Sequence, residues 1–170
     1  MADRLLSNSL KNSGGTVLNS HAYVYDLAGE RTKQTFKDGN YLDYTYDALA
    51  QLKTALGKEI GGASRLHEQF KYGYDYARNL NYRTNNALNQ TFGVNNLNQL
   101  TNATRSGTLT VAGTTTSVAT NVTVKTSSQT NNVTPYLDNT FGAAGSILLK
   151  ATTRSRPLRR TAAIARTPTR

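Results

Sequence analysis

The chain has no cysteine, no tryptophan and two histidines, and 37% of its 170 residues are hydrophobic. The absence of cysteine excludes disulfide frameworks and thiolate metal sites. The hydrophobic fraction lies below the globular average of about 45–50%, so we do not expect a large conventional core. No apolar run approaches the roughly 20 residues of a membrane-spanning helix, and residues 1–16 lack the apolar segment of a signal peptide.

Acidic residues are scarce in the second half of the chain. Residues 1–80 carry ten basic and nine acidic side chains, whereas residues 81–170 carry ten and one. The net charge of +10 therefore belongs mainly to the end of the chain, where six arginines gather: Arg154, Arg156, Arg159, Arg160, Arg166 and Arg170. Low hydrophobicity and the absence of acids predict a disordered basic tail at 151–170.

The tail would attract phosphates through charge alone. Because no aromatic residues are interleaved with Arg159 and Arg160, we do not expect a nucleic-acid partner, and a solvated tail is our preferred interpretation. The pattern of strands is lost near Gly145, and we hypothesise that the reading frame changed there. Translation of the other two frames beyond codon 145 would test this idea.

A short aromatic motif recurs along the first half. The pattern Tyr-x-Tyr-Asp stands at Tyr23–Asp26, Tyr44–Asp47 and Tyr72–Asp75, and Phe92–Asn95 is a degenerate fourth copy. The last residues of the four copies are separated by 21, 28 and 20 positions. Such a period is typical of a solenoid or an array of hairpins.

Large side chains alternate around these motifs with the strand period of two, which puts each set on one face of a sheet. The sets are Leu42, Tyr44 and Tyr46; Leu52, Thr54 and Leu56; Phe70, Tyr72 and Tyr74; and Leu80 and Tyr82. Tyr41 and Tyr76 fall outside this phase.

Turn residues fit the same scheme. An Asp in first place and a Gly in fourth suit a type I turn at Asp26–Gly29, while the turns after Asp47 and Asp75 keep only the Asp. The Asp38-Gly39 pair predicts a tight hairpin turn. We expect a longer loop at 57–62 to account for the step of 28 residues.

The motif Tyr-x-Tyr-Asp-x-x-Gly, followed by a short strand, resembles the YD repeat of bacterial RHS-type proteins, and Asn79–Arg83 is similar to its Gly-Asn-Leu variant. The resemblance covers roughly residues 20 to 105. It implies an array of β-hairpins that winds into a hollow shell around a C-terminal effector, often a toxin, in a secreted or cell-surface protein. The repeat-defining residues are Tyr23, Tyr25, Asp26, Gly29, Tyr44, Tyr46, Asp47, Tyr72, Tyr74 and Asp75.

From Thr101 onward the composition shifts to Thr, Ser, Asn, Ala and Val. The run from Asn121–Val124 to Asp138–Phe141 resembles the opening strands of a bacterial Ig-like domain. We therefore predict an all-β fold with four parts: a polar N-terminal segment (1–20), a hairpin array (21–105), an incomplete Ig-like β segment (106–150) and a disordered tail (151–170).

We predict no catalytic, metal or cofactor site. Asp26, Asp47 and Asp75 are explained by turn capping, and neither His21 nor His67 has a second ligand at metal-binding spacing. The leading interpretation is a structural module whose partners are neighbouring repeats of a longer parent chain. The alternative is a carbohydrate-binding or cell-surface interaction module, in which Tyr41 and Tyr76 are the candidate glycan contacts.

Overall fold

The computed structural model describes residues 3–125, 130–133 and 135–147, and in these ranges it contains thirteen strands and no helix. The expectation of an all-β fold is confirmed. The predicted tail at 151–170 lies outside the described residues, as does most of the segment after the proposed frame change. The strands are Ser7–Lys11 (β1), Val17–Tyr25 (β2), Arg31–Phe36 (β3), Tyr41–Tyr46 (β4), Leu52–Lys58 (β5), Ser64–Tyr74 (β6), Leu80–Asn85 (β7), Leu88–Val94 (β8), Leu100–Ser106 (β9), Thr108–Thr114 (β10), Val122–Lys125 (β11), Thr130–Val133 (β12) and Thr140–Ile147 (β13).

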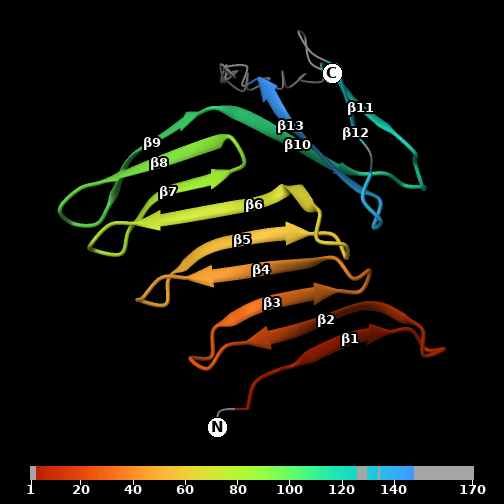
Figure 1. The fold of residues 1–170 in the computed structure, drawn as a ribbon. Coiled ribbons are helices and arrows are strands. Elements are labelled where there is room, and N and C mark those ends of the chain that lie inside the picture. The colour runs from red at the N-terminus through yellow and green to blue at the C-terminus, as the bar shows by residue number, and fades with distance from the viewer. Residues whose placement is uncertain (1–2, 126–129, 134, 148–170) are drawn as a thin grey trace, which may run out of the picture.

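Strands β1 to β9 form one antiparallel sheet in which spatial order follows chain order (Figure 1). The sheet begins at Ser7, so it includes part of residues 1–20, which were predicted to form a separate polar segment. Every connection is a hairpin between adjacent strands, which is why short turn motifs recur at regular intervals.

One type of turn closes seven of the eight hairpins in this sheet. In the turn that starts at Asp26, the Asp26 N–H donates to the Glu30 carbonyl, and the Gly29 N–H donates to the Asp26 carbonyl. The fourth residue of each turn has a positive φ, which glycine adopts without strain. These fourth residues are Gly15, Gly29, Gly39, Ala50, Gly62, Arg78 and Asn98.

A β-bulge follows each turn of the Tyr-x-Tyr-Asp copies. Tyr46 pairs with Leu52 and Thr45 pairs with Thr54, so Lys53 has no partner of its own. Directly opposed residues share a face, and one extra residue sends the following side chains to the other face. The prediction that Leu52, Thr54 and Leu56 share one face is therefore wrong. The same shift separates Leu80 from Tyr82.

The long repeat step does not arise from a loop at 57–62, and that prediction is also wrong. Strand β5 continues to Lys58, and the turn at 59–63 has the usual form. Lys58 pairs with Ser64 and Leu56 pairs with Gln69, so the four residues 65–68 stand opposite Gly57 alone. The additional residues therefore lengthen two strands and form a protrusion on β6.

The chain after β9 forms two small ladders, one between β10 and β13 and one between β11 and β12. Gly107, with a φ of 89°, separates β9 from β10. Figure 1 shows β10 leading away from the end of β9. The segment predicted to be Ig-like thus contains four described strands in two ladders, and β13 lies against the protrusion of β6.

Burial is limited in this arrangement. Among the described residues, only Ala55 and Ala143 are buried hydrophobic side chains, and Asn40 and Arg65 are the buried polar ones. A single sheet layer cannot enclose a core by itself, because one face must be covered by another layer. The stability of the sheet therefore depends on contacts between neighbouring strands.

Candidate functional site

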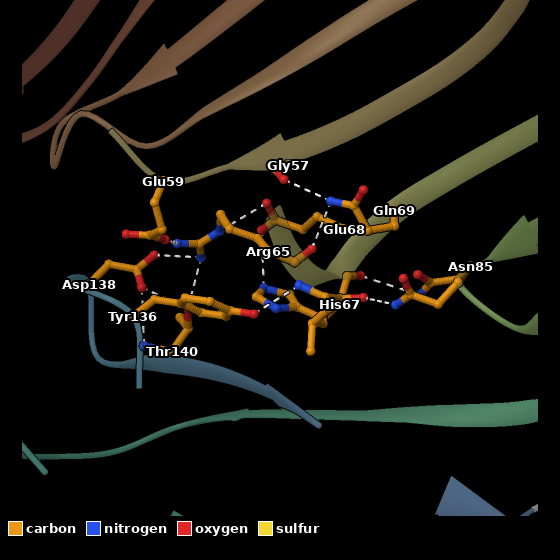
Figure 2. A network of polar contacts seen from close by, with 12 residues as sticks. Gly57, Glu59, Arg65, His67, Glu68, Gln69, Asn85, Tyr136, Asp138 and Thr140 are labelled. Carbon is orange, nitrogen blue, oxygen red and sulfur yellow. Dashed lines mark hydrogen bonds and ion pairs between the residues drawn. The ribbon is translucent and has the colours of Figure 1, made fainter. Parts of the chain in front are cut away.

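The most buried large side chain belongs to Arg65, on the protrusion of β6. Its exposed fraction is 1%. A buried arginine requires hydrogen-bonding partners for its guanidinium, because an unpaired buried charge is strongly disfavoured. Figure 2 shows the side chains that surround it.

Three carboxylates and a hydroxyl accept hydrogen bonds from Arg65. Its Nε donates to Glu68 at 3.1 Å and its Nη1 donates to Glu59. Its Nη2 donates to Asp138 at 2.8 Å and to the Thr140 hydroxyl at 2.7 Å. Glu59 opens the β5–β6 turn, whereas Asp138 lies in the turn before β13 and Thr140 is the first residue of β13. The guanidinium therefore joins the sheet to the C-terminal strands.

Tyr136 completes this junction. Its hydroxyl accepts a hydrogen bond from the Leu66 N–H at 2.8 Å, and its ring centroid lies 4.8 Å from the Arg65 Cζ. The ring also lies 5.7 Å from that of His67. Tyr136 begins the turn into β13, so the same turn supplies both the aromatic ring and the carboxylate of Asp138.

The junction changes the ionisation of its members. Burial by itself raises the pKa of Asp138, but hydrogen bonds from Thr140 and Arg65 outweigh it and hold the pKa below its ordinary value. For Glu68 the effect of burial is likewise outweighed, by His67 and Arg65, and its pKa is lowered. Burial opposes the charge of Arg65, yet its hydrogen bonds to the carboxylates raise its pKa. All three groups are therefore charged at neutral pH.

The chemistry available to this junction is restricted. Arginine does not deprotonate in proteins, so the centre of the junction cannot serve as a general base. The described residues contain no group of three or more His, Cys, Asp or Glu that could hold a metal ion. The arrangement is suited to holding two parts of the chain together.

The motif tyrosines form a second cluster, which we call the tyrosine face. The second tyrosine of each full copy donates its hydroxyl to a backbone carbonyl near the start of the preceding strand. These bonds join Tyr25 to Leu5 at 3.0 Å, Tyr46 to Arg31 at 3.0 Å and Tyr74 to Leu52 at 3.1 Å.

The hydroxyls of these tyrosines donate to carbonyls that lie beyond the last residue pair of the adjacent ladder. Strands β3 and β4 pair only from Thr35 and Tyr41 to Lys33 and Asp43, so Arg31 lies beyond the last pair. An unpaired carbonyl needs another donor when water is excluded, and the tyrosine hydroxyl supplies one. Burial raises the pKa of Tyr46 and Tyr74, so both remain protonated donors at neutral pH.

The motif acids cap turns. Asp26 accepts hydrogen bonds from the N–H groups of Gly29 and Glu30 at 2.8 and 2.9 Å. Asp47 contacts its own turn in the same way, and Asp75 accepts from the Asn79 N–H at 2.8 Å. Asn95, in the degenerate copy, accepts from the N–H groups of Leu97 and Gln99. The amide oxygen thus replaces the carboxylate.

A cavity of about 440 Å³ opens on the tyrosine face of the first copy. Its lining residues are Tyr25, Gly29, Glu30, Arg31, Tyr44, Tyr46 and Leu52. Glu30 and Arg31 depart from the repeat, because the same two places hold Gln51-Leu52, Asn79-Leu80 and Gln99-Leu100 in the other copies. Loss of hydration, with Asp26 close by, raises the pKa of Glu30.

The two candidate glycan contacts occupy different environments. Tyr76 is fully exposed in the turn between β6 and β7. Tyr41 is half-buried on β4, where the Lys33 Nζ lies 3.9 Å from its ring centroid. Tyr41 lies three positions before Tyr44 on the same strand, so its side chain is on the face opposite the tyrosine face. The two rings belong to separate elements and do not form one site.

Sequence reasoning missed the Arg65 junction. Three signals pointed to it. The step from Asp47 to Asp75 is seven residues longer than the one before, and Asp138 is the single acid after residue 80. Tyr136 is the single tyrosine after Tyr82.

The described residues include no helix that is long and apolar enough to cross a membrane. No protein-family model matches the chain, and no curated protein matches it. The crystal structure of TcdB2-TccC3-Cdc42 is similar, with a TM-score of 0.46 and 13% identity over 81% of this chain. The chain spans 7% of the chain that it matches there. A likeness at this TM-score assigns no function.

Proposed function

We propose that the chain is a structural module, a stretch of β-hairpin wall of the RHS type in a larger surface or secreted protein. The observation that carries this proposal is the repeated hydrogen bond from Tyr46 to Arg31 and from Tyr74 to Leu52. In each full copy the second tyrosine holds the preceding strand or the residues just before it, and the acid caps the turn that follows. These contacts use the motif side chains to hold the sheet together, which is the role of a structural wall.

Neighbouring repeats of a longer parent chain are the partners that this role requires. The resemblance of the motif to the YD repeat extends the proposal to a shell that encloses an effector, such as a toxin, in a secreted or surface protein. The Arg65 junction then fixes β6, inside the array, to the segment that follows the array.

Duplication of one unit tests the array. A second copy of residues 26–46, inserted between Tyr46 and Asp47, should add two strands to the sheet. Strands lie about 4.8 Å apart, so the sheet should lengthen by roughly 10 Å in small-angle X-ray scattering. The free energy of unfolding should not fall. A matched variant with 21 Gly and Ser residues at the same position should loop out and lose stability. Equal behaviour of the two insertions would contradict the proposal.

A second candidate function is saccharide binding, and the cavity on the tyrosine face favours it. Aromatic rings stack on sugar rings, and the adjacent carboxylate and guanidinium of Glu30 and Arg31 can accept from and donate to hydroxyl groups. Glu30→Gln with Arg31→Leu restores the residues of the next copy, so it should remove binding to a glycan array while keeping the fold. Tyr41→Ala and Tyr76→Ala test the two sequence-predicted contacts separately. Absence of binding to any glycan would end this candidate.

A further inference from the structure

The outer edge of β9 is open. Strand β9 pairs with β8 on one side, and the chain then continues past Gly107 into β10, which pairs with β13. No other described strand pairs with β9. All seven of its residues are exposed. Four further described strands follow β9 in the chain, and they pair only with one another.

An open edge presents a row of unpaired N–H and C=O groups that another strand can bind. Proteins usually block such edges with proline, inward-pointing charges or bulges. Strand β9 contains neither proline nor lysine, and its one charged residue is Arg105. Its bulge lies at the Leu100 end, which leaves the rest of the edge regular.

The odd number of strands in the sheet determines the orientation in which a second copy can pair with β9. All neighbours in the nine-stranded sheet are antiparallel, so β1 and β9 run in the same direction. A second copy added head to tail, with its tyrosine face on the same side, would place its β1 parallel to β9 and would break the pattern. A twofold axis perpendicular to the sheet instead makes β9 antiparallel to the β9 of the second copy. It also keeps the tyrosine faces of both copies on the same side.

The register follows from length and charge. The central residue of β9 is Ala103. An axis at Ala103 gives the longest overlap and pairs Ala103 with itself, Asn102 with Thr104 and Thr101 with Arg105. An axis at Arg105 would place two like charges directly opposite each other, which is destabilising. We propose that two copies of this chain associate through β9, antiparallel and centred on Ala103, to form one continuous sheet.

Cysteine cross-linking tests the proposal, because the chain contains no cysteine of its own. Directly opposed residues in an antiparallel pair have Cα atoms about 4.5 or 5.5 Å apart, and both distances permit a disulfide. Ala103→Cys should therefore form a disulfide-linked dimer rapidly under mild oxidation. Leu97→Cys, in the exposed turn before β9, is the control and should form it slowly, because the proposed axis places the two turns at opposite ends of the strand pair. Equal rates for the two variants would indicate random collision and would overturn the proposal.

Charge substitution gives an independent readout. Ala103→Lys and Ala103→Glu should each be monomeric in analytical ultracentrifugation, because like charges would meet at the axis. An equimolar mixture of the two should restore the dimer as a heterodimer. Circular dichroism of each variant should match that of the original chain, since residue 103 is exposed. The proposal is overturned if the original chain is monomeric at every accessible concentration, which would be the result if its own residues covered the edge.

Discussion

Tyr46 donates its hydroxyl to the backbone carbonyl of Arg31 at 3.0 Å, beyond the point where the ladder between β3 and β4 ends. The same relationship joins Tyr74 to Leu52 on the next pair of strands. The hydroxyl therefore explains why the second aromatic position of the motif is tyrosine. Phenylalanine would fill the same space but would leave the carbonyl without this donor.

Removal of these hydroxyls should measure their contribution directly. Tyr46→Phe and Tyr74→Phe should each lower the free energy of unfolding by about 0.5–1.5 kcal/mol, the usual net value of one hydrogen bond. Tyr76→Phe is the control, because that side chain is fully exposed. Urea denaturation followed by circular dichroism provides the measurement. A loss at Tyr76 equal to those at the two motif positions would contradict the assignment.

Replacement of the buried guanidinium should have a larger effect. Arg65→Met leaves Glu59, Glu68 and Asp138 without their shared cation. Loss of one partner of a buried ion pair costs about 3–5 kcal/mol, and we expect a value near the lower limit because the carboxylates are partly exposed. Hydrogen exchange should increase first in β13 and in the protrusion of β6. Lys53→Met, at an exposed bulge position, should leave both measurements unchanged.

Acid should weaken the same junction. The pKa values of Glu68 and Asp138 are lower in the folded state than in the unfolded chain. Their stabilisation is therefore complete above the unfolded pKa of about 4 and is lost as the pH falls through the folded values. Urea unfolding between pH 7 and pH 2 should show this loss in the original chain, and Arg65→Met should show a smaller dependence. An identical pH dependence in the two proteins would refute the explanation.

Alkali should act on the tyrosine face. Burial raises the pKa of Tyr46 and Tyr74, so the stability they contribute is complete below about pH 10, the ordinary value for tyrosine, and is lost as the pH rises through the folded values. The double variant Tyr46→Phe and Tyr74→Phe should be less stable at pH 7 but should lose less between pH 9 and pH 12. Thermal unfolding across this range is the measurement.

The turns offer a test of backbone strain alone. A methyl group added to Gly15 would meet no heavy atom within 4 Å, yet Gly15 has a φ of 82°. Gly15→Ala should therefore destabilise by about 1 kcal/mol through the left-handed backbone only. Ala50 has a φ of 62°, so Ala50→Gly should relieve strain of similar size, partly offset by the greater freedom of the unfolded chain. If both substitutions change stability in the same direction, strain at the fourth turn position is not the cause.

The local features of the fold could be predicted because they are encoded within a few residues. The alternation of Leu42, Tyr44 and Tyr46 and the turn at Asp26–Gly29 belong to this class. Bulges could not be predicted, because the unpaired position of Lys53 or Asn81 is visible only when two strands are aligned. These bulges are the reason that Leu56 does not share a face with Leu52, and that Tyr82 does not share one with Leu80.

The Arg65 junction lay beyond sequence reasoning for a different reason. Its members are Glu59, Arg65, Glu68, Asp138 and Thr140, and the last two lie more than 70 positions from Arg65. In a strand whose sequence alternates, an arginine is normally expected to be exposed to solvent. Only the close approach of β13 to β6 removes water from it, and no local pattern reports a contact across that separation.

The turn geometry has a consequence for how such a chain can change its length in evolution. From Asp26 to Asp47 the backbone runs out along one strand, returns along the next and arrives at the same edge facing the same way. Gain or loss of a whole segment of this kind leaves the flanking sequence in its original orientation, so tandem duplication and deletion in the gene need not disturb what lies on either side. Gain or loss of a segment half as long, with one strand instead of two, would make the rest of the polypeptide run in the opposite direction.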